Sequence, residues 1–102
     1  MYSITIHVEA EKHIAEHYLY YEEQLPGLGS EFISSFETCL KYIQSHPLSS
    51  EAKYKGYRMA MINRFPYGAF YLINQKHKIV LVAGVYFLQI NPTSIKRSLR
   101  KI

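Results

Sequence analysis

Few side chains in this sequence have the type and spacing that metal binding or catalysis requires. His13 and His17 lie four residues apart in a predicted helix, a spacing at which two imidazoles can bind one metal ion. No third or fourth ligand stands at an obvious position, so we predict no metal site and no cofactor. The single cysteine, Cys39, falls on the apolar stripe of a second predicted helix, which indicates a buried structural thiol and not a nucleophile.

Aromatic and basic side chains are interleaved in the second half of the chain. Tyr54, Tyr67 and Tyr86 lie near basic residues. Such a pattern suits single-stranded nucleic acid, whose phosphates pair with the cations and whose bases stack on the rings. Tyrosine also fills cores, where the ring is buried and the hydroxyl needs a partner. The tyrosines that we predict to lie in the core are Tyr18, Tyr21, Tyr57 and Tyr71.

Charge is distributed unevenly along the chain. The first 51 residues carry all eight acidic side chains and only two basic ones, a formal charge of −6, while the remaining residues carry ten basic side chains and no acidic one, +10. The second half cannot neutralise its own cations. It is therefore expected to attract nucleic acid or an acidic protein. The alternative is that the acidic helices screen this charge by packing across the sheet.

Length and composition restrict the class of protein. At 102 residues the chain has room for one core, so we predict a single domain over residues 1–102. The hydrophobic fraction of 48% excludes disordered and low-complexity classes, and one cysteine excludes a disulfide-built scaffold. The longest apolar run, residues 79–88, is far shorter than the roughly 20 residues of a membrane-spanning helix. Without a predicted signal peptide, the expected compartment is the cytoplasm and no membrane is involved.

The first half predicts one strand and two helices. Residues 2–8 alternate apolar and polar side chains, as a half-buried strand does. Over residues 9–25 the apolar spacing changes to three and four, from Ala10 to Leu25, which predicts a helix. Residues 26–29 end that helix, and Ser30 is a plausible N-cap for a second one that closes at residues 46–47. Two helices joined by so short a loop form an antiparallel hairpin.

Strands dominate the second half, after a predicted surface loop over residues 47–54. The predicted strands cover residues 56–62, 65–74 and 79–87. The last strand is almost wholly apolar, so we expect it at the centre of the sheet, covered on both faces. Asn91, Pro92 and Thr93 then open a short final helix. The order β-α-α-β-β-β-α predicts an α+β fold, with the helical hairpin packed on a small, mostly antiparallel sheet.

Several local motifs occur together in the order that they have in a known family. They are Tyr20-Tyr21-Glu22-Glu23-Gln24, Pro26-Gly27-Leu28-Gly29, Phe32, His46-Pro47, Tyr57-Arg58, Arg64-Phe65-Pro66-Tyr67, Phe70-Tyr71, residues 79–85 and Pro92. Each motif alone is weak, but their joint order from the first helix to Pro92 is specific. The chain resembles the RelE/ParE superfamily of bacterial type II toxins, the group also called plasmid stabilisation proteins.

This resemblance implies a small growth-inhibiting toxin, neutralised by a cognate antitoxin that lays an acidic or amphipathic segment over the toxin's basic sheet. RelE-like members cleave mRNA on the ribosome, whereas ParE-like members inhibit DNA gyrase. Many members end the central strand with a histidine and place an arginine shortly before the proline, but here those positions hold Phe87 and Ile90. We therefore expect a ParE-like toxin that acts by binding. The alternatives are a RelE-like, ribosome-dependent mRNA endonuclease and a chain that retains only antitoxin binding.

Candidate site residues follow from this resemblance and from the basic second half. In the endonuclease alternative, Arg58 and Arg64 would bind the phosphate and Tyr67 would act as the acid. The residues expected to bind the target or the antitoxin are Lys53, Lys55, Arg58, Arg64, Tyr86, Lys96, Arg97 and Arg100. The helical cations among them have a second interpretation, as the solvated face of a short helix whose C-terminal end favours positive charge. The sequence leaves the oligomeric state open.

Overall fold

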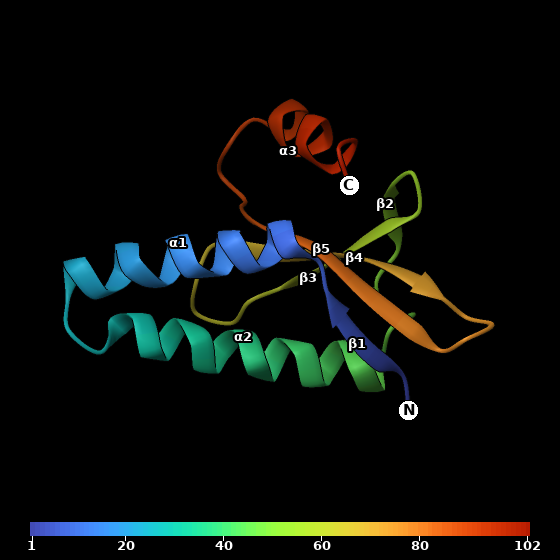
Figure 1. The fold of residues 1–102 in the computed structure, drawn as a ribbon, viewed down its shortest axis with the longest axis horizontal. Helices are drawn as coiled ribbons and strands as arrows, with labels where there is room; N and C mark the ends of the chain where they lie inside the picture. Colours follow the sequence, from blue (N-terminus) through green and yellow to red (C-terminus); the bar gives the residue numbers. More distant parts are fainter.

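The computed structural model describes residues 1–102 and consists of three helices and one five-stranded sheet (Figure 1). In chain order they are β1 (Ser3–Ile6), α1 (Val8–Gln24), α2 (Leu28–Ser45), β2 (Ala52–Tyr54), β3 (Tyr57–Met61), β4 (Tyr67–Asn74), β5 (Ile79–Phe87) and α3 (Pro92–Leu99). The strand order is β1-β5-β4-β3-β2, with β1 and β5 parallel and the other neighbours antiparallel. The predicted α+β class, a helical hairpin on a mostly antiparallel sheet, is confirmed.

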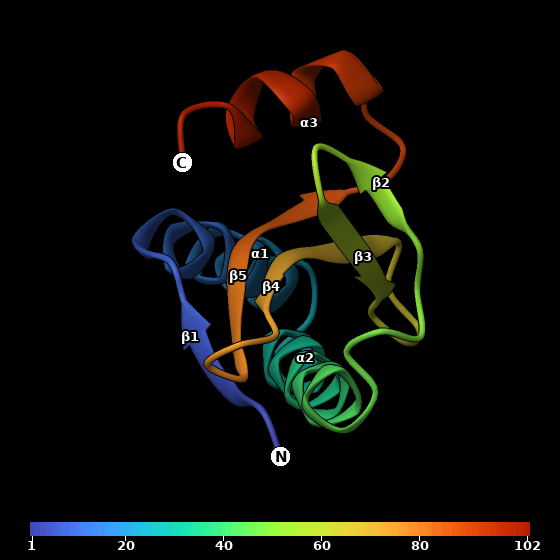
Figure 2. The same ribbon diagram turned by 90° about the vertical axis from the view of Figure 1, so that its right-hand side faces the viewer.

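The sheet separates two hydrophobic layers. Figure 2 shows α2 on one side of the sheet and α3 on the other, with α1 running beside α2 and the edge of β5. The layer under the hairpin joins Phe32 and Ile43 of α2 to Val80 and Val82 of β5. The smaller layer consists of Tyr57, Phe70, Ala83, Tyr86, Ile95 and Leu99. Because β5 lies between β1 and β4 and contributes to both layers, the prediction of an interior strand with apolar packing on both faces is confirmed, although its first residue, Ile79, is 38% exposed.

The joint between α1 and α2 is made by a glutamate and not by the predicted serine cap. Glu22 Oε1 accepts hydrogen bonds from the backbone N–H groups of Gly27, Gly29 and Ser30, at 3.0, 2.9 and 3.3 Å. A carboxylate from α1 thus satisfies the free amides at the start of α2. The second helix begins at Leu28 with Gly27 at its N-cap, so the predicted N-cap at Ser30 is wrong. Local patterns around Ser30 could not show this, because the capping group comes from the preceding helix.

A short strand occupies the end of the predicted loop. Residues 52–54 form β2, which pairs with β3, so the loop prediction is wrong for those three residues. Lys55 and Gly56 connect the two strands with positive φ values of 46° and 84°. Positive φ at both central residues is the geometry of a two-residue hairpin turn. β2 is mostly exposed, and it forms through backbone pairing without the apolar alternation that marks a strand in sequence.

Other boundaries shift by small amounts. Leu25, predicted to lie on the apolar stripe of the first helix, is the C-cap of α1 and is 57% exposed. Tyr57 and Tyr71 are buried as predicted, whereas Tyr18 and Tyr21 are only half-buried. The final helix begins as predicted, with Asn91 Oδ1 accepting from the N–H of Thr93 at 2.9 Å. None of the three helices combines the length and the apolarity needed to cross a membrane.

Two histidines of α1 bind the part of β5 that β1 does not reach. The pairing of β1 with β5 ends at Val82. Beyond it, the N–H of Val85 donates to His13 Nδ1 at 3.2 Å, and His17 Nε2 donates to the carbonyl of Val85 at 2.8 Å. The histidine pair whose spacing resembles a metal site is therefore engaged with backbone. Burial is the main cause that lowers the pKa of both imidazoles, and for His13 the neighbouring His17 lowers it further.

We expect Gly29→Ala to lower the free energy of unfolding by about 1–3 kcal/mol, because the two helices must move apart to accept it. A Cβ at Gly29 would lie 2.6 Å from Glu22 Cγ and 2.6 Å from the backbone oxygen of Tyr18. Urea unfolding measures the loss. Ser30→Ala is the control, and it should change the value by less than about 0.5 kcal/mol because this exposed side chain does not cap α2. Equal losses in the two variants would contradict this account.

Stability should also fall as the pH is lowered. His13 and His17 have a pKa below the ordinary value of 6.5 in the folded chain, so the unfolded chain binds more protons as the pH falls through 6.5. The contribution of these two neutral histidines to the free energy of unfolding is therefore complete above that pH and is lost below it. A protonated His13 also cannot accept from Val85. The urea concentration at the unfolding midpoint should decrease from pH 7.5 to pH 5. In the His13→Leu variant this midpoint should decrease less steeply over the same range. Equal pH dependence in the two proteins would contradict the role given to His13.

Candidate functional site

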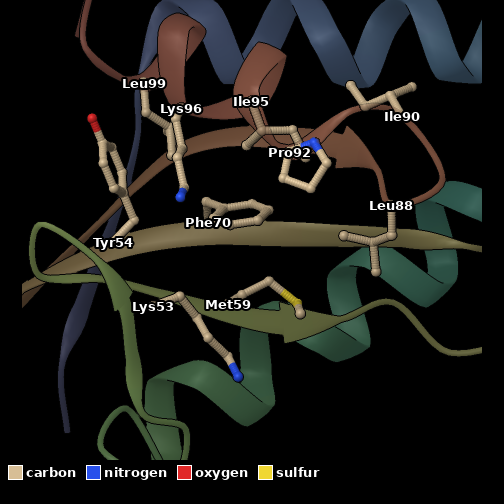
Figure 3. Close-up of a pocket in the computed structure, with 10 residues that line it drawn as sticks. All are labelled: Lys53, Tyr54, Met59, Phe70, Leu88, Ile90, Pro92, Ile95, Lys96 and Leu99. Atoms are coloured by element: carbon tan, nitrogen blue, oxygen red, sulfur yellow. The ribbon is translucent and has the colours of Figure 1, made fainter.

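A groove on the face that carries α3 is the main candidate site (Figure 3). It has a volume of about 230 Å³, and its floor is formed by Met59 of β3, Phe70 of β4 and Leu88 beyond β5. Its other lining residues are Lys53, Tyr54, Ile90, Pro92, Ile95, Lys96 and Leu99. Figure 3 shows Lys53 and Lys96 on opposite sides, with Met59 and Phe70 between them. The groove is thus an apolar trough with a cationic rim.

Several cationic side chains contact Tyr54 at one end of this groove. The ammonium nitrogens of Lys55 and Lys96 lie 5.8 and 5.4 Å from the centre of its ring, and Arg100 Nε donates to its hydroxyl at 3.0 Å. The hydrogen bond from Arg100, followed by the charges of Arg100, Lys55 and Lys96, lowers the pKa of Tyr54. Three predicted binding residues, Lys55, Lys96 and Arg100, therefore meet at Tyr54, while Lys53 lines the opposite side of the groove.

No carboxylate neutralises this cluster. The two ion pairs of the structure are Lys12 with Glu9 and Arg64 with Glu31, and both lie outside the groove. Arg97, the fifth cation of the predicted set, is exposed and lies two residues from each of the buried Ile95 and Leu99. That spacing places it on the opposite side of α3, facing away from the groove.

Tyr86 fastens α3 to the sheet and does not offer its ring to a ligand. It is 7% exposed, and its hydroxyl donates to Ser98 Oγ at 2.7 Å. Burial is the main cause that raises the pKa of Tyr86. Ile95 and Leu99 pack in the same layer, and the hydroxyl of Tyr57 donates to the carbonyl of Leu99 at 3.5 Å. The structure therefore places Tyr86 beneath the groove's helical wall, as part of its support.

Arg58 points to the other face of the sheet. It pairs across the strands with Tyr71, and cross-strand partners share a face. Its guanidinium donates to the carbonyl of Ser50, whose hydroxyl lies 3.1 Å from that of Tyr71. The Tyr71 hydroxyl donates to the carbonyl of Pro47 at 2.9 Å. Arg58 thus holds the segment that follows α2 against the hairpin face.

Arg64 and Tyr67 are also separated from the groove. Arg64 Nη2 lies 3.2 Å from Glu31 Oε1 in a partly exposed pair. Tyr67 is 6% exposed, and its ring lies 4.3 Å from that of His17, centre to centre. Burial is the main cause that raises the pKa of Tyr67, with Tyr21 adding to it. The three residues expected to act together in the endonuclease alternative therefore do not converge on one point.

The apolar floor of the groove was missed from the sequence. Met59 and Phe70 alternate with hairpin-face residues along their strands, so their spacing indicates only that they share a face. Whether that face is fully covered depends on how far α3 extends over it. No local signal carries this information.

The sequence and fold match known proteins. The model of the family described as the ParE toxin of type II toxin-antitoxin system, parDE, matches residues 4–86. A comparison with curated proteins finds no match. Among solved structures, a chain of the chromosomal ParDE toxin–antitoxin system from P. aeruginosa superposes with a TM-score of 0.75 at 15% identity, covering 87% of this chain and 98% of that one.

Two further structures share the fold. The isolated E. coli RelE toxin gives a TM-score of 0.66 at 13% identity, with both chains covered completely. The RelBE2 toxin–antitoxin complex from Mycobacterium tuberculosis gives 0.59 at 17% identity, covering 84% of this chain and 96% of that one. At such identities the superpositions establish the common fold alone.

Proposed function

Because the chain belongs to the ParE toxin family of type II toxin–antitoxin systems, we propose that it inhibits DNA gyrase by binding and that a cognate antitoxin neutralises it by covering the groove. The observation that carries this proposal is the groove itself, with its apolar floor and a rim whose charges are all positive. Such a surface docks protein segments and offers little to a chemical reaction. Both partners would be met in the bacterial cytoplasm, which is the proposed compartment.

The antitoxin segment that fits the groove is amphipathic and acidic. Apolar side chains would pack on Met59, Phe70 and Ile90, and carboxylates would face Lys53 and Lys96. The rim cations are exposed, so their attraction extends into solvent and speeds the encounter with an acidic partner at low salt. Burial of the apolar floor would supply most of the affinity, because exposed ion pairs contribute little.

The placement of the other candidate residues favours binding over mRNA cleavage. General acid–base catalysis needs its groups within hydrogen-bond reach of the same reacting atoms. Arg58 is bonded to Ser50, Arg64 is paired with Glu31, and Tyr67 is buried against α1. The groove contains two lysines and a tyrosine but neither a carboxylate nor an imidazole that could act as a base. The endonuclease is therefore the second hypothesis, and experiment must separate the two.

We expect the purified chain to inhibit supercoiling by DNA gyrase in a dose-dependent way. The double variant Lys53→Glu/Lys96→Glu should need about tenfold more protein for the same inhibition, because each reversal replaces an attraction at the rim by a repulsion. Lys41→Glu/Lys76→Glu is the matched control, since it makes the same charge change at exposed positions outside the groove. Circular dichroism shows whether each variant is folded.

Three outcomes would contradict the gyrase proposal. Inhibition that the rim and control variants lower equally would show that net charge, and not the groove, is responsible. Normal supercoiling by gyrase at micromolar concentrations of the chain, together with mRNA cleavage on ribosomes, would establish the endonuclease hypothesis. Absence of both activities and of growth arrest would leave a chain that binds only the antitoxin.

Antitoxin binding is expected to depend on the apolar part of the groove. Ile90 is 39% exposed and lines the groove, so Ile90→Glu places a carboxylate there at little cost to folding. Calorimetric titration with the cognate antitoxin should show at least a tenfold weaker complex. Leu48→Glu is the matched control, because Leu48 is 51% exposed and lies outside the groove. Unchanged affinity for Ile90→Glu would place the antitoxin elsewhere.

A further inference from the structure

A second hollow lies beside α1 and shares no residue with the groove. It has a volume of about 470 Å³. Its lining consists of Glu16, His17, Tyr20 and Tyr21 of α1, Tyr67 at the start of β4 and Phe87 at the end of β5. The gyrase and antitoxin proposals make no use of it.

Five of the six lining side chains are rings, and they form a continuous wall. The ring centres of His17 and Tyr67 are 4.3 Å apart, and those of Tyr67 and Phe87 are 5.5 Å apart. Tyr20 and Tyr21 meet edge to face at 5.3 Å. Tyr67 is 6% exposed and Tyr20 is 55% exposed, so the wall runs from a buried floor to solvent. Phe87, which stands where the resemblance predicts a histidine, is part of this wall.

The sixth side chain supplies a negative charge without a partner. Glu16 is exposed, forms neither of the two ion pairs in the structure, and lies one helical turn from Tyr20. Glu16 lines the hollow together with His17 and Tyr20 of the same helix, so its carboxylate stands beside the rings. Neither lysine nor arginine lines the hollow.

We propose that this hollow binds an arginine side chain presented by a protein partner. Aromatic ring faces attract cations, and a guanidinium stacks on a ring while donating two N–H groups to a carboxylate. Glu16 and the tyrosine wall supply both kinds of contact side by side. The hollow opens to solvent at Glu16 and Tyr20, so a side chain projecting from another protein can enter it. The helix that carries Glu16, α1, holds five glutamates and one lysine, and this negative charge attracts a basic segment.

The test is a titration of the full chain with blocked amino acids, followed by the NMR signals of the tyrosine rings. N-acetyl-arginine methylamide should shift the signals of Tyr20 and Tyr67 saturably, with a Kd on the order of 10 mM. The lysine analogue should bind at least threefold more weakly, and the neutral citrulline analogue should not saturate. Glu16→Gln should weaken arginine binding about five- to tenfold, and Tyr20→Leu about threefold. Glu37→Gln, an exposed carboxylate change on α2, should have no effect.

Several results would overturn the proposal. Equal binding of citrulline, or arginine binding that survives Glu16→Gln, would show that the hollow does not recognise the cation. Lysine binding as tight as arginine would remove the guanidinium assignment. Shifts of the same ring signals with protein concentration alone would mean that a second copy of the chain, and not a different partner, fills the hollow. None of these results depends on gyrase inhibition, so the two proposals fail independently.

Discussion

The constraint on which the rest of the structure depends is the need of the apolar strand β5 for partners on both faces and at both edges. This nine-residue strand is apolar on both faces, so each face needs a hydrophobic layer and each edge needs hydrogen-bond partners. The hairpin of α1 and α2 covers one face, and α3 covers part of the other. β4 pairs along one edge, while β1 and then His13 and His17 of α1 occupy the other. The eight-residue α3 does not extend over the whole outer face of the sheet, and beside it Met59 of β3 and Phe70 of β4 remain accessible as the floor of the groove.

Charge segregation then gives each side of the molecule its preference. Carboxylates occur only in the first half, where Glu22 joins α1 to α2 and Glu31 reaches Arg64. Neither ion pair of the structure involves the hairpin of β2 and β3 or α3, so the cations that meet at Tyr54 stay unpaired. The alternative that the acidic helices screen the basic half is thus met only by the ion pair of Glu31 with Arg64.

The sequence predicted the order and packing of the main elements, and what it missed depends on contacts between residues far apart in the chain. Periodicity gave the order of the main elements, and Asn91 with Pro92 marked the start of α3. It could not give the cap by Glu22, which belongs to the other helix, or β2, which exists only through its pairing with β3. Arg58 was predicted beside the other cations, yet its register opposite Tyr71 turns it to the hairpin face. Of the predicted site residues, Lys53, Lys55, Lys96 and Arg100 lie in or beside the groove. The side chains of Arg58, Arg64, Tyr67 and Tyr86 instead contact other parts of the fold.

Two hollows of opposite charge on one small chain limit what a partner can do. The groove accepts carboxylates because its rim holds only cations, whereas the hollow beside α1 accepts a cation because Glu16 is its one charged group. A segment suited to one is repelled by the other, since like charges brought together in partly desolvated sites are costly. Each site thus excludes the other's ligand, and a partner that engages both must carry acidic and basic residues on separate segments. The distribution of charge therefore determines which segment of such a partner lies in the groove and which lies beside α1, and so determines the partner's orientation.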